Sequence, residues 1–81
     1  PITVKRADNV DDELYVTGQN FTECRQVSIS GKLRSATIFI NSSTLMLPAT
    51  TLEPLDVVAV SQVTAQGEAL SQSNQFTYVG S

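Results

Sequence analysis

An acidic stretch from Asp8 to Glu13 is the part of the sequence that comes nearest to a metal-binding motif. Four of its six residues carry carboxylates, namely Asp8, Asp11, Asp12 and Glu13. Hard cations such as Ca²⁺ bind several oxygen ligands at once, so the stretch is a candidate calcium loop. It lacks the glycine and the regular ligand spacing of an EF-hand. We therefore interpret residues 8–13 as a solvated turn between two strands, and calcium binding stays a hypothesis.

The side chains that nucleophilic catalysis needs are scarce. The sequence has no histidine and no tryptophan, and Cys24 is its single cysteine. A cation beside it, Arg25, could favour the thiolate, but no histidine is present to act as its base. A Ser-His-Asp triad also needs histidine, and no glycine-rich phosphate-binding loop is present. We therefore predict a domain that is not an enzyme, with no catalytic residue, metal site or cofactor.

Carbohydrate binding by stacking would need exposed, flat aromatic rings. The five aromatic residues include Tyr15 and Phe39, which strand alternation turns outward or toward a second sheet, whereas it turns Phe21, Phe76 and Tyr78 inward. Two exposed rings on neighbouring strands would form a small patch for a sugar or a protein partner. Carbohydrate is the less favoured of these two ligands.

Two sequons for N-glycosylation occur, at Asn20-Phe21-Thr22 and at Asn41-Ser42-Ser43. In a chain this rich in serine and threonine, two matches carry little information, so glycosylation of either asparagine stays open. Asn20 also follows a glycine at the end of a predicted strand. Its side chain is therefore expected to bond to the backbone of a turn.

The stretch from Leu14 to Phe21 gives the clearest strand signal in the sequence, and the other predicted strands are placed relative to it. Leu14 and Val16 alternate with polar neighbours, which is typical of a strand with one buried face. Gly18 is expected to end this strand, through either a positive φ or a close backbone approach that a Cβ would block. Phe21 then returns to the buried face as the first core residue.

Six further segments show strand patterning and turn signals, and helical periodicity is weak throughout. The longest apolar run, from Asp56 to Val63, is expected to be a central strand that is buried on part of both faces. The seven predicted strands are residues 2–4, 14–17, 27–30, 36–40, 44–47, 56–63 and 76–79. This spacing predicts an all-β, immunoglobulin-like antiparallel β-sandwich of about seven strands without a disulfide.

Charge and length limit the classes of partner. All five basic residues lie in the first 34 positions and the net charge is −3, which disfavours nucleic acid. A local basic patch of Arg25, Lys32 and Arg34 is the one alternative. No apolar run approaches the ~20 residues that a membrane span needs. Residues 1–81 are expected to form one domain, and because the chain does not begin with methionine we expect it to be excised from a larger protein.

These markers together resemble the IPT/TIG domain, which has an immunoglobulin-like fold. The resemblance covers residues 2–79, and its markers occur in the family's order. They are the strand-Gly-x-Asn-Phe stretch of residues 16–21, a short strand before Gly31, Thr44-Leu45-x-Leu47-Pro48, the valine-rich strand, Gly67 and the terminal Phe76-x-Tyr78. Two features depart from the family, since the acidic stretch replaces a proline-and-glycine opening turn and no glycine lies near Leu55.

The resemblance implies several functions, and fold alone does not choose among them. We expect a non-catalytic binding or spacer module, of the adhesion type, in a larger extracellular or cell-surface protein. Its partner would be a protein or a neighbouring domain of the same chain. The alternatives are an accessory domain of a secreted polysaccharide-active enzyme, a transcription-factor dimerisation domain and a decoration or tail module of a phage virion.

Overall fold

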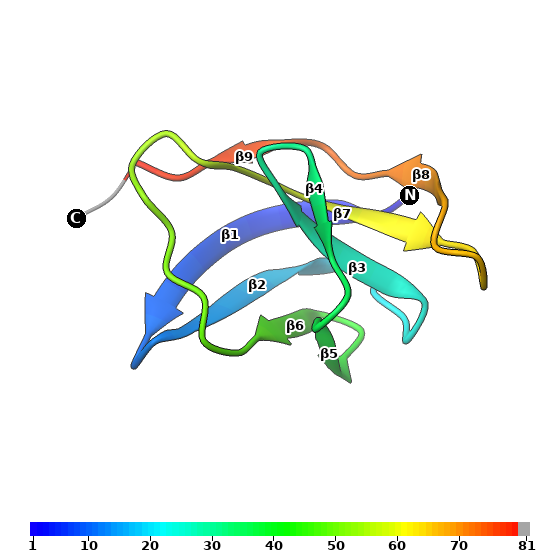
Figure 1. Cartoon of the computed structure of the whole chain (residues 1–81), viewed down its shortest axis with the longest axis horizontal. Coiled ribbons are helices and arrows are strands. Elements are labelled where there is room, and N and C mark those ends of the chain that lie inside the picture. Colours follow the sequence, from blue (N-terminus) through cyan, green and yellow to red (C-terminus); the bar gives the residue numbers. More distant parts are fainter. Residues whose placement is uncertain (80–81) are drawn as a thin grey trace.

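Two antiparallel sheets build the domain (Figure 1), and the computed structural model describes residues 1–79. Sheet A has the order β1-β2-β6-β5. Sheet B has the order β4-β3-β7-β8, and β9 also pairs with β7. The strands are β1 (Thr3–Val10), β2 (Glu13–Gln19), β3 (Arg25–Ile29), β4 (Lys32–Arg34), β5 (Ile38–Asn41), β6 (Thr44–Leu47), β7 (Val57–Val63), β8 (Ala69–Gln72) and β9 (Phe76–Thr77).

This strand order is that of an immunoglobulin-like sandwich. Such sandwiches pair strands A, B, E and D in one sheet and C, F and G in the other, to which a C′ strand can be added. Here β1, β2, β6 and β5 take the first set of places, and β3, β7 and the β8–β9 segment take the second, with β4 as C′. The predicted all-β fold without a disulfide is confirmed, and Cys24 is a free, exposed thiol. Residues 1–79 contain no helix that is long and apolar enough to cross a membrane.

The core lies between the sheets and consists of the inward positions of the longest strands. Phe21 is 2% exposed and is among the largest fully buried side chains, as predicted. The others in that group are Leu14, Val16, Val27, Leu45, Leu47, Val58 and Val60. Phe76 and Tyr78 pack against this cluster and stay partly exposed. The valine-rich strand β7 is central, as expected, because it pairs with β3 along one edge and with β8 and β9 along the other, and residues on both of its faces are buried.

Gly18 lies within β2 and does not end it. Its Cα is paired with that of Val4 on β1, and the chain turns two residues later, at Asn20, where φ is 67°. A Cβ built on Gly18 would stand 1.8 Å from the backbone oxygen of Thr3 and 2.8 Å from Cζ of Phe21. The glycine is therefore required by a close backbone approach.

The acidic stretch is mostly strand, which corrects the predicted turn. β1 continues to Val10, and a two-residue turn at Asp11 and Asp12 joins it to β2. Both aspartates have positive φ, at 50° and 66°, as two-residue hairpin turns of the primed types require, and aspartate tolerates this conformation better than most residues.

Nine strands occur in residues 1–79, so two were not predicted. β4 has three residues, too few for an alternation to be recognised, and the four residues of β8 are all exposed, so β8 shows no alternation. β5 also differs from its prediction, because it begins at Ile38 and a bulge between Phe39 and Asn41 leaves Ile40 without a Cα partner on β6.

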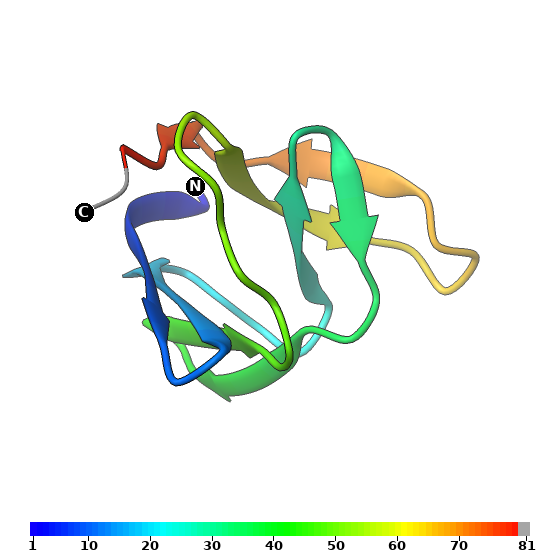
Figure 2. The same cartoon turned by 60° about the vertical axis from the view of Figure 1, so that its left-hand side comes forward.

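Two asparagine side chains fasten β1 to distant segments. The Asn74 side chain accepts a hydrogen bond from the Val4 amide and donates one to the Val4 carbonyl, both at 2.9 Å. Asn9 donates to the Thr50 carbonyl at 2.7 Å and accepts from the Leu52 amide at 2.7 Å. The Asn9 amide thus holds the long connection between β6 and β7 where it passes from one sheet to the other (Figure 2), and the Asn74 amide holds the segment between β8 and β9.

Candidate functional site

The edges of the two sheets differ in how they discourage strand pairing. In the described part of the chain β1 and β5 lie at the edges of sheet A; β4 lies at one edge of sheet B, and β8 and β9, which both pair with β7, lie at the other. β1 has a bulge and carries Lys5 and Arg6, and the short β4 carries Lys32 and Arg34. Charges, bulges and short length all blunt an edge strand. Those two edges are therefore protected.

The β5 edge carries no charged side chain. Its first three residues, Ile38, Phe39 and Ile40, are 43%, 37% and 46% exposed. β5 packs against β6 and makes no comparable contact with any strand of sheet B, which explains why these apolar residues are not covered. β8 is uncharged too, but its exposed residues include Ser71 and Gln72. β5 is therefore the more apolar of the two uncharged edges.

An apolar row runs from β5 across the outer face of sheet A. The Cα of Met46 is paired with that of Ile38 on one side and that of Tyr15 on the other. Since the neighbouring pair Leu14 and Leu47 faces the core, these three side chains point outward. We call Ile38, Met46 and Tyr15 the β5 surface.

Tyr15 lies at the end of the β5 surface farthest from the sheet edge, and Glu13 holds its hydroxyl. Its hydroxyl donates a hydrogen bond to Oε1 of Glu13 at 3.1 Å. This hydrogen bond raises the pKa of Tyr15 above the usual 10.0, and the negative charge of Glu13, slight desolvation and Asp11 add to the effect. Each of these factors disfavours the phenolate. The ring therefore presents a neutral hydroxyl over a wide pH range.

Glu13→Gln is expected to lower the pKa of Tyr15, because it removes both the carboxylate acceptor and its charge. The measurement is an ultraviolet titration in a Tyr78→Phe background, which leaves Tyr15 as the single tyrosine. Glu53→Gln is the control, since Glu53 lies in the connection between β6 and β7. A Tyr15 pKa that does not fall in Glu13→Gln would show that the carboxylate does not act on the phenol.

The structure does not bring the acidic side chains of residues 8–13 together. Asp8 forms an exposed ion pair with Arg6 at 2.5 Å, and Glu13 accepts from Tyr15. Asp11 and Asp12 form the turn itself. Within residues 1–79, no group of three or more His, Cys, Asp or Glu side chains is placed to hold a metal ion.

The other residues singled out by sequence lie apart from the β5 surface. Cys24 is exposed in the connection before β3. Arg25 points back along the chain, since its Nε donates to the Asn20 carbonyl at 3.3 Å. The other two members of the proposed basic patch, Lys32 and Arg34, both lie on β4.

The two sequon asparagines are both exposed and both form backbone hydrogen bonds. Asn20 donates to the Pro1 carbonyl at 2.5 Å, as expected for a side chain that fixes a turn. Asn41 ends β5, and its Oδ1 accepts from the Ser43 amide at 2.8 Å. Asn41 is the sequon residue that borders the β5 surface.

The predicted two-ring patch does not form. Tyr15 lies on β2 and Phe39 on β5, and β6 separates these strands. Phe39 is paired with Leu45, a core position, so the two rings also belong to opposite faces of sheet A. Strand alternation identified both residues as outward or sheet-facing, but it could not show which strands are neighbours.

Sequence reasoning also missed a feature of sheet B, a hollow flanked by the two unpredicted strands.

The chain was compared with protein-family models, curated proteins and solved structures, and none of them matches this chain.

Proposed function

We propose that this chain is a non-catalytic binding and spacer module of a larger extracellular or surface-exposed protein, and that β5 accepts an extended strand from its partner. The partner is another protein or a neighbouring domain of the same chain. The observation that carries the proposal is the contrast among the edges. β1 and β4 carry cations, whereas β5 exposes Ile38, Phe39 and Ile40 without any charge. An exposed apolar edge is a template for pairing with another chain.

Strand addition also accounts for the apolar row beside the edge. An added strand would gain main-chain hydrogen bonds from β5, and alternate side chains would lie on the two faces of sheet A. Those on the outer face would meet Ile38 and Met46, with Tyr15 behind them. The bulge after Phe39 limits regular pairing to a short segment. The proposed contact is therefore short, with its specificity supplied by the apolar row.

Two sequence features agree with this class of function. The resemblance to IPT/TIG domains suggests adhesion or domain positioning, and the net charge of −3 favours a protein over a nucleic acid partner. The proposal does not depend on any catalytic group.

The proposal is tested with a displayed library of short extended peptides, selected against the whole domain. Selected peptides are expected to shift the amide resonances of β5 and β6 in an NMR titration. Ile40→Lys places a charge on the edge and should weaken their binding at least about tenfold. Val10→Lys is the matched control, because Val10 is an equally exposed apolar residue at the end of β1. Peptides that bind Ile40→Lys as well as the wild type, or a library that yields no β5 binder, would refute strand addition at this edge.

A further inference from the structure

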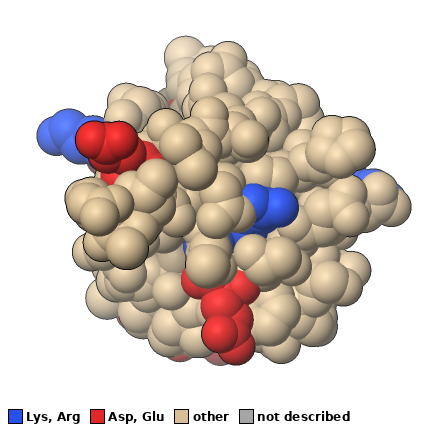
Figure 3. Space-filling model, turned by 90° about the vertical axis from the view of Figure 1, so that its right-hand side faces the viewer, with Lys and Arg blue, Asp and Glu red and all other residues tan. Residues whose placement is uncertain are grey.

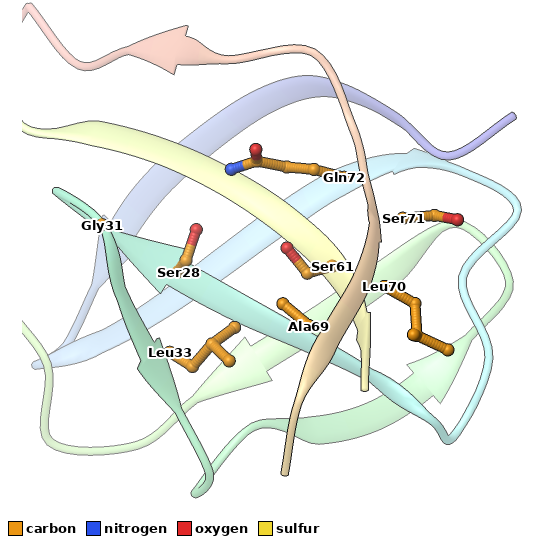
Figure 4. A pocket seen from close by; sticks show the side chains of 8 residues that line it. All are labelled: Ser28, Gly31, Leu33, Ser61, Ala69, Leu70, Ser71 and Gln72. Atoms are coloured by element: carbon orange, nitrogen blue, oxygen red, sulfur yellow. The ribbon is translucent and has the colours of Figure 1, made fainter. Parts of the chain in front are cut away.

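A hollow of about 330 Å³ lies on the outer face of sheet B, on the side away from the core. β3 and β7 form its floor, and β4 and β8 form its flanks (Figure 4). Ser28 of β3 and Ser61 of β7 lie on the floor, while Gln72 of β8 reaches over it. Leu33 of β4 supplies an aliphatic wall, whereas the Leu70 side chain extends from β8 away from the two serines and borders only the outside of the hollow.

The two floor serines are buried although they do not face the core. Their neighbours Val27, Ile29 and Val60 point into the core, so both serines point outward. They are nevertheless only 5% and 2% exposed, because the flanking strands enclose them. In Figure 4 both hydroxyl oxygens point to the side on which the Gln72 carboxamide lies.

Neither hydroxyl forms a hydrogen bond with another residue of the described chain. No polar side-chain atom of residues 1–79 that is sealed from solvent lacks a partner. Each of the two hydroxyls therefore keeps some exposure, and Figure 4 shows both on the side of the hollow. Hydroxyls that are more than nine-tenths buried are normally hydrogen-bonded within the protein. The Ser28 and Ser61 hydroxyls are instead available to hydrogen-bond a ligand in the hollow.

We propose that this hollow binds a neutral, polyhydroxylated ligand about the size of one sugar ring. The residues that line it carry no charge, which disfavours anionic and cationic ligands because they would lose hydration without gaining an opposite charge. A hydroxyl both donates and accepts, and a carboxamide offers one acceptor and two donors. Ser28, Ser61 and Gln72 therefore match neighbouring ligand hydroxyls, which also donate and accept.

The size and walls of the hollow agree with this ligand. Its volume lies at the lower end of the range for small-molecule sites, roughly 300–1,000 Å³. Leu33 can cover the C–H face of a sugar ring. Since no aromatic ring lines the hollow for stacking, we expect weak binding, with a Kd on the order of 1 mM. The side of the molecule on which β8 lies also shows few charged groups (Figure 3).

The test is an NMR titration of the whole domain with neutral methyl glycosides of common hexoses, to roughly 100 mM. At least one is expected to give saturable shifts at the amides of Ser28, Ser61 and Gln72. Ser61→Ala and Gln72→Ala should each weaken that binding at least about threefold, since each removes one hydrogen-bonding group. Ser42→Ala, in the exposed turn between β5 and β6, is the matched control and should bind as the wild type does.

Three outcomes would overturn the proposal: shifts that do not saturate, saturable shifts away from the hollow, and binding that Ser61→Ala and Gln72→Ala leave unchanged. Tighter binding of methyl glucuronoside than of methyl glucoside would overturn its neutral character. The origin of the sugar is distinguished by affinity electrophoresis in neutral polysaccharide gels. If the polysaccharide slows the domain and Ser61→Ala abolishes this effect, the ligand is a sugar unit of a polymer. If the domain migrates at its normal rate but still binds the glycoside, the ligand is a free sugar. Since β5 lies on the other sheet, this result is independent of the peptide-binding experiment.

Discussion

Gly18→Ala is expected to destabilise the domain by at least about 3 kcal/mol. The new Cβ would stand 1.8 Å from the Thr3 carbonyl oxygen. That oxygen belongs to the backbone of β1, which is paired with β2 at this point, so the strands themselves would have to separate. A domain of this length has a total stability of about 4–12 kcal/mol. Urea unfolding of the variant should therefore show at least about a quarter of that stability lost.

Gly67→Ala is the control that separates this clash from backbone strain. Gly67 has a φ of +87° but no atom lies within 4 Å of its ideal Cβ position. The alanine should therefore cost only the strain of a left-handed residue, about 1–2 kcal/mol. Equal losses in the two variants would mean that the approach of β1 to β2 at Gly18 is not as close as described.

Phe21→Ala is expected to cost about 3–5 kcal/mol, the usual range for removing a buried aromatic ring. The side chain is 2% exposed, and its backbone is fixed by the hydrogen bond from its amide to the Ser42 carbonyl at 3.0 Å. Rigid strands around the ring prevent the cavity from collapsing fully. The measurement is again the free energy of unfolding in urea.

Phe39→Ala removes the same ring from the exposed β5 edge and is the matched control for this loss. Phe39 is 37% exposed and its strand pairs with β6, so the cost should stay below that of Phe21→Ala by at least about 1 kcal/mol. A loss below about 1 kcal/mol in Phe21→Ala would remove Phe21 from the core. It would also mean that the turn at Asn20 does not serve to return Phe21 to the core.

The fold was predictable because the burial of one strand face leaves a clear period of two. Leu14, Val16, Leu45 and Leu47 occupy alternate positions, and the structure places all four in the core. The acidic stretch was misassigned because its carboxylates suggested a loop, although alternate positions of β1 face solvent and accept charges readily. β8 could not be predicted, since all four of its residues are exposed.

The candidate sites depend on contacts between segments that are distant in the sequence. Residues 38–40 are apolar and were predicted to belong to a strand over 36–40, but the pattern could not show that β5 lies at an edge with no strand of sheet B packed against it. The pairing of Ile38, Met46 and Tyr15 joins three strands whose registers no local pattern fixes. Ser28 and Ser61 resembled ordinary strand residues. Only the enclosure of both by β4 and β8 distinguishes them.

The two hydrogen bonds between the Asn74 side chain and the Val4 backbone, here called the Asn74 clamp, determine how the domain would respond to tension. β1 and the segment that leads into β9 run in the same direction in Figure 1, and both hydrogen bonds of the clamp cross between them. Pulling the two ends of the chain apart would slide these segments lengthwise, so both bonds would be loaded in shear at the same moment and would have to break together. A module strung between neighbouring domains would thereby resist extension until the clamp fails, and the sandwich behind it would then open.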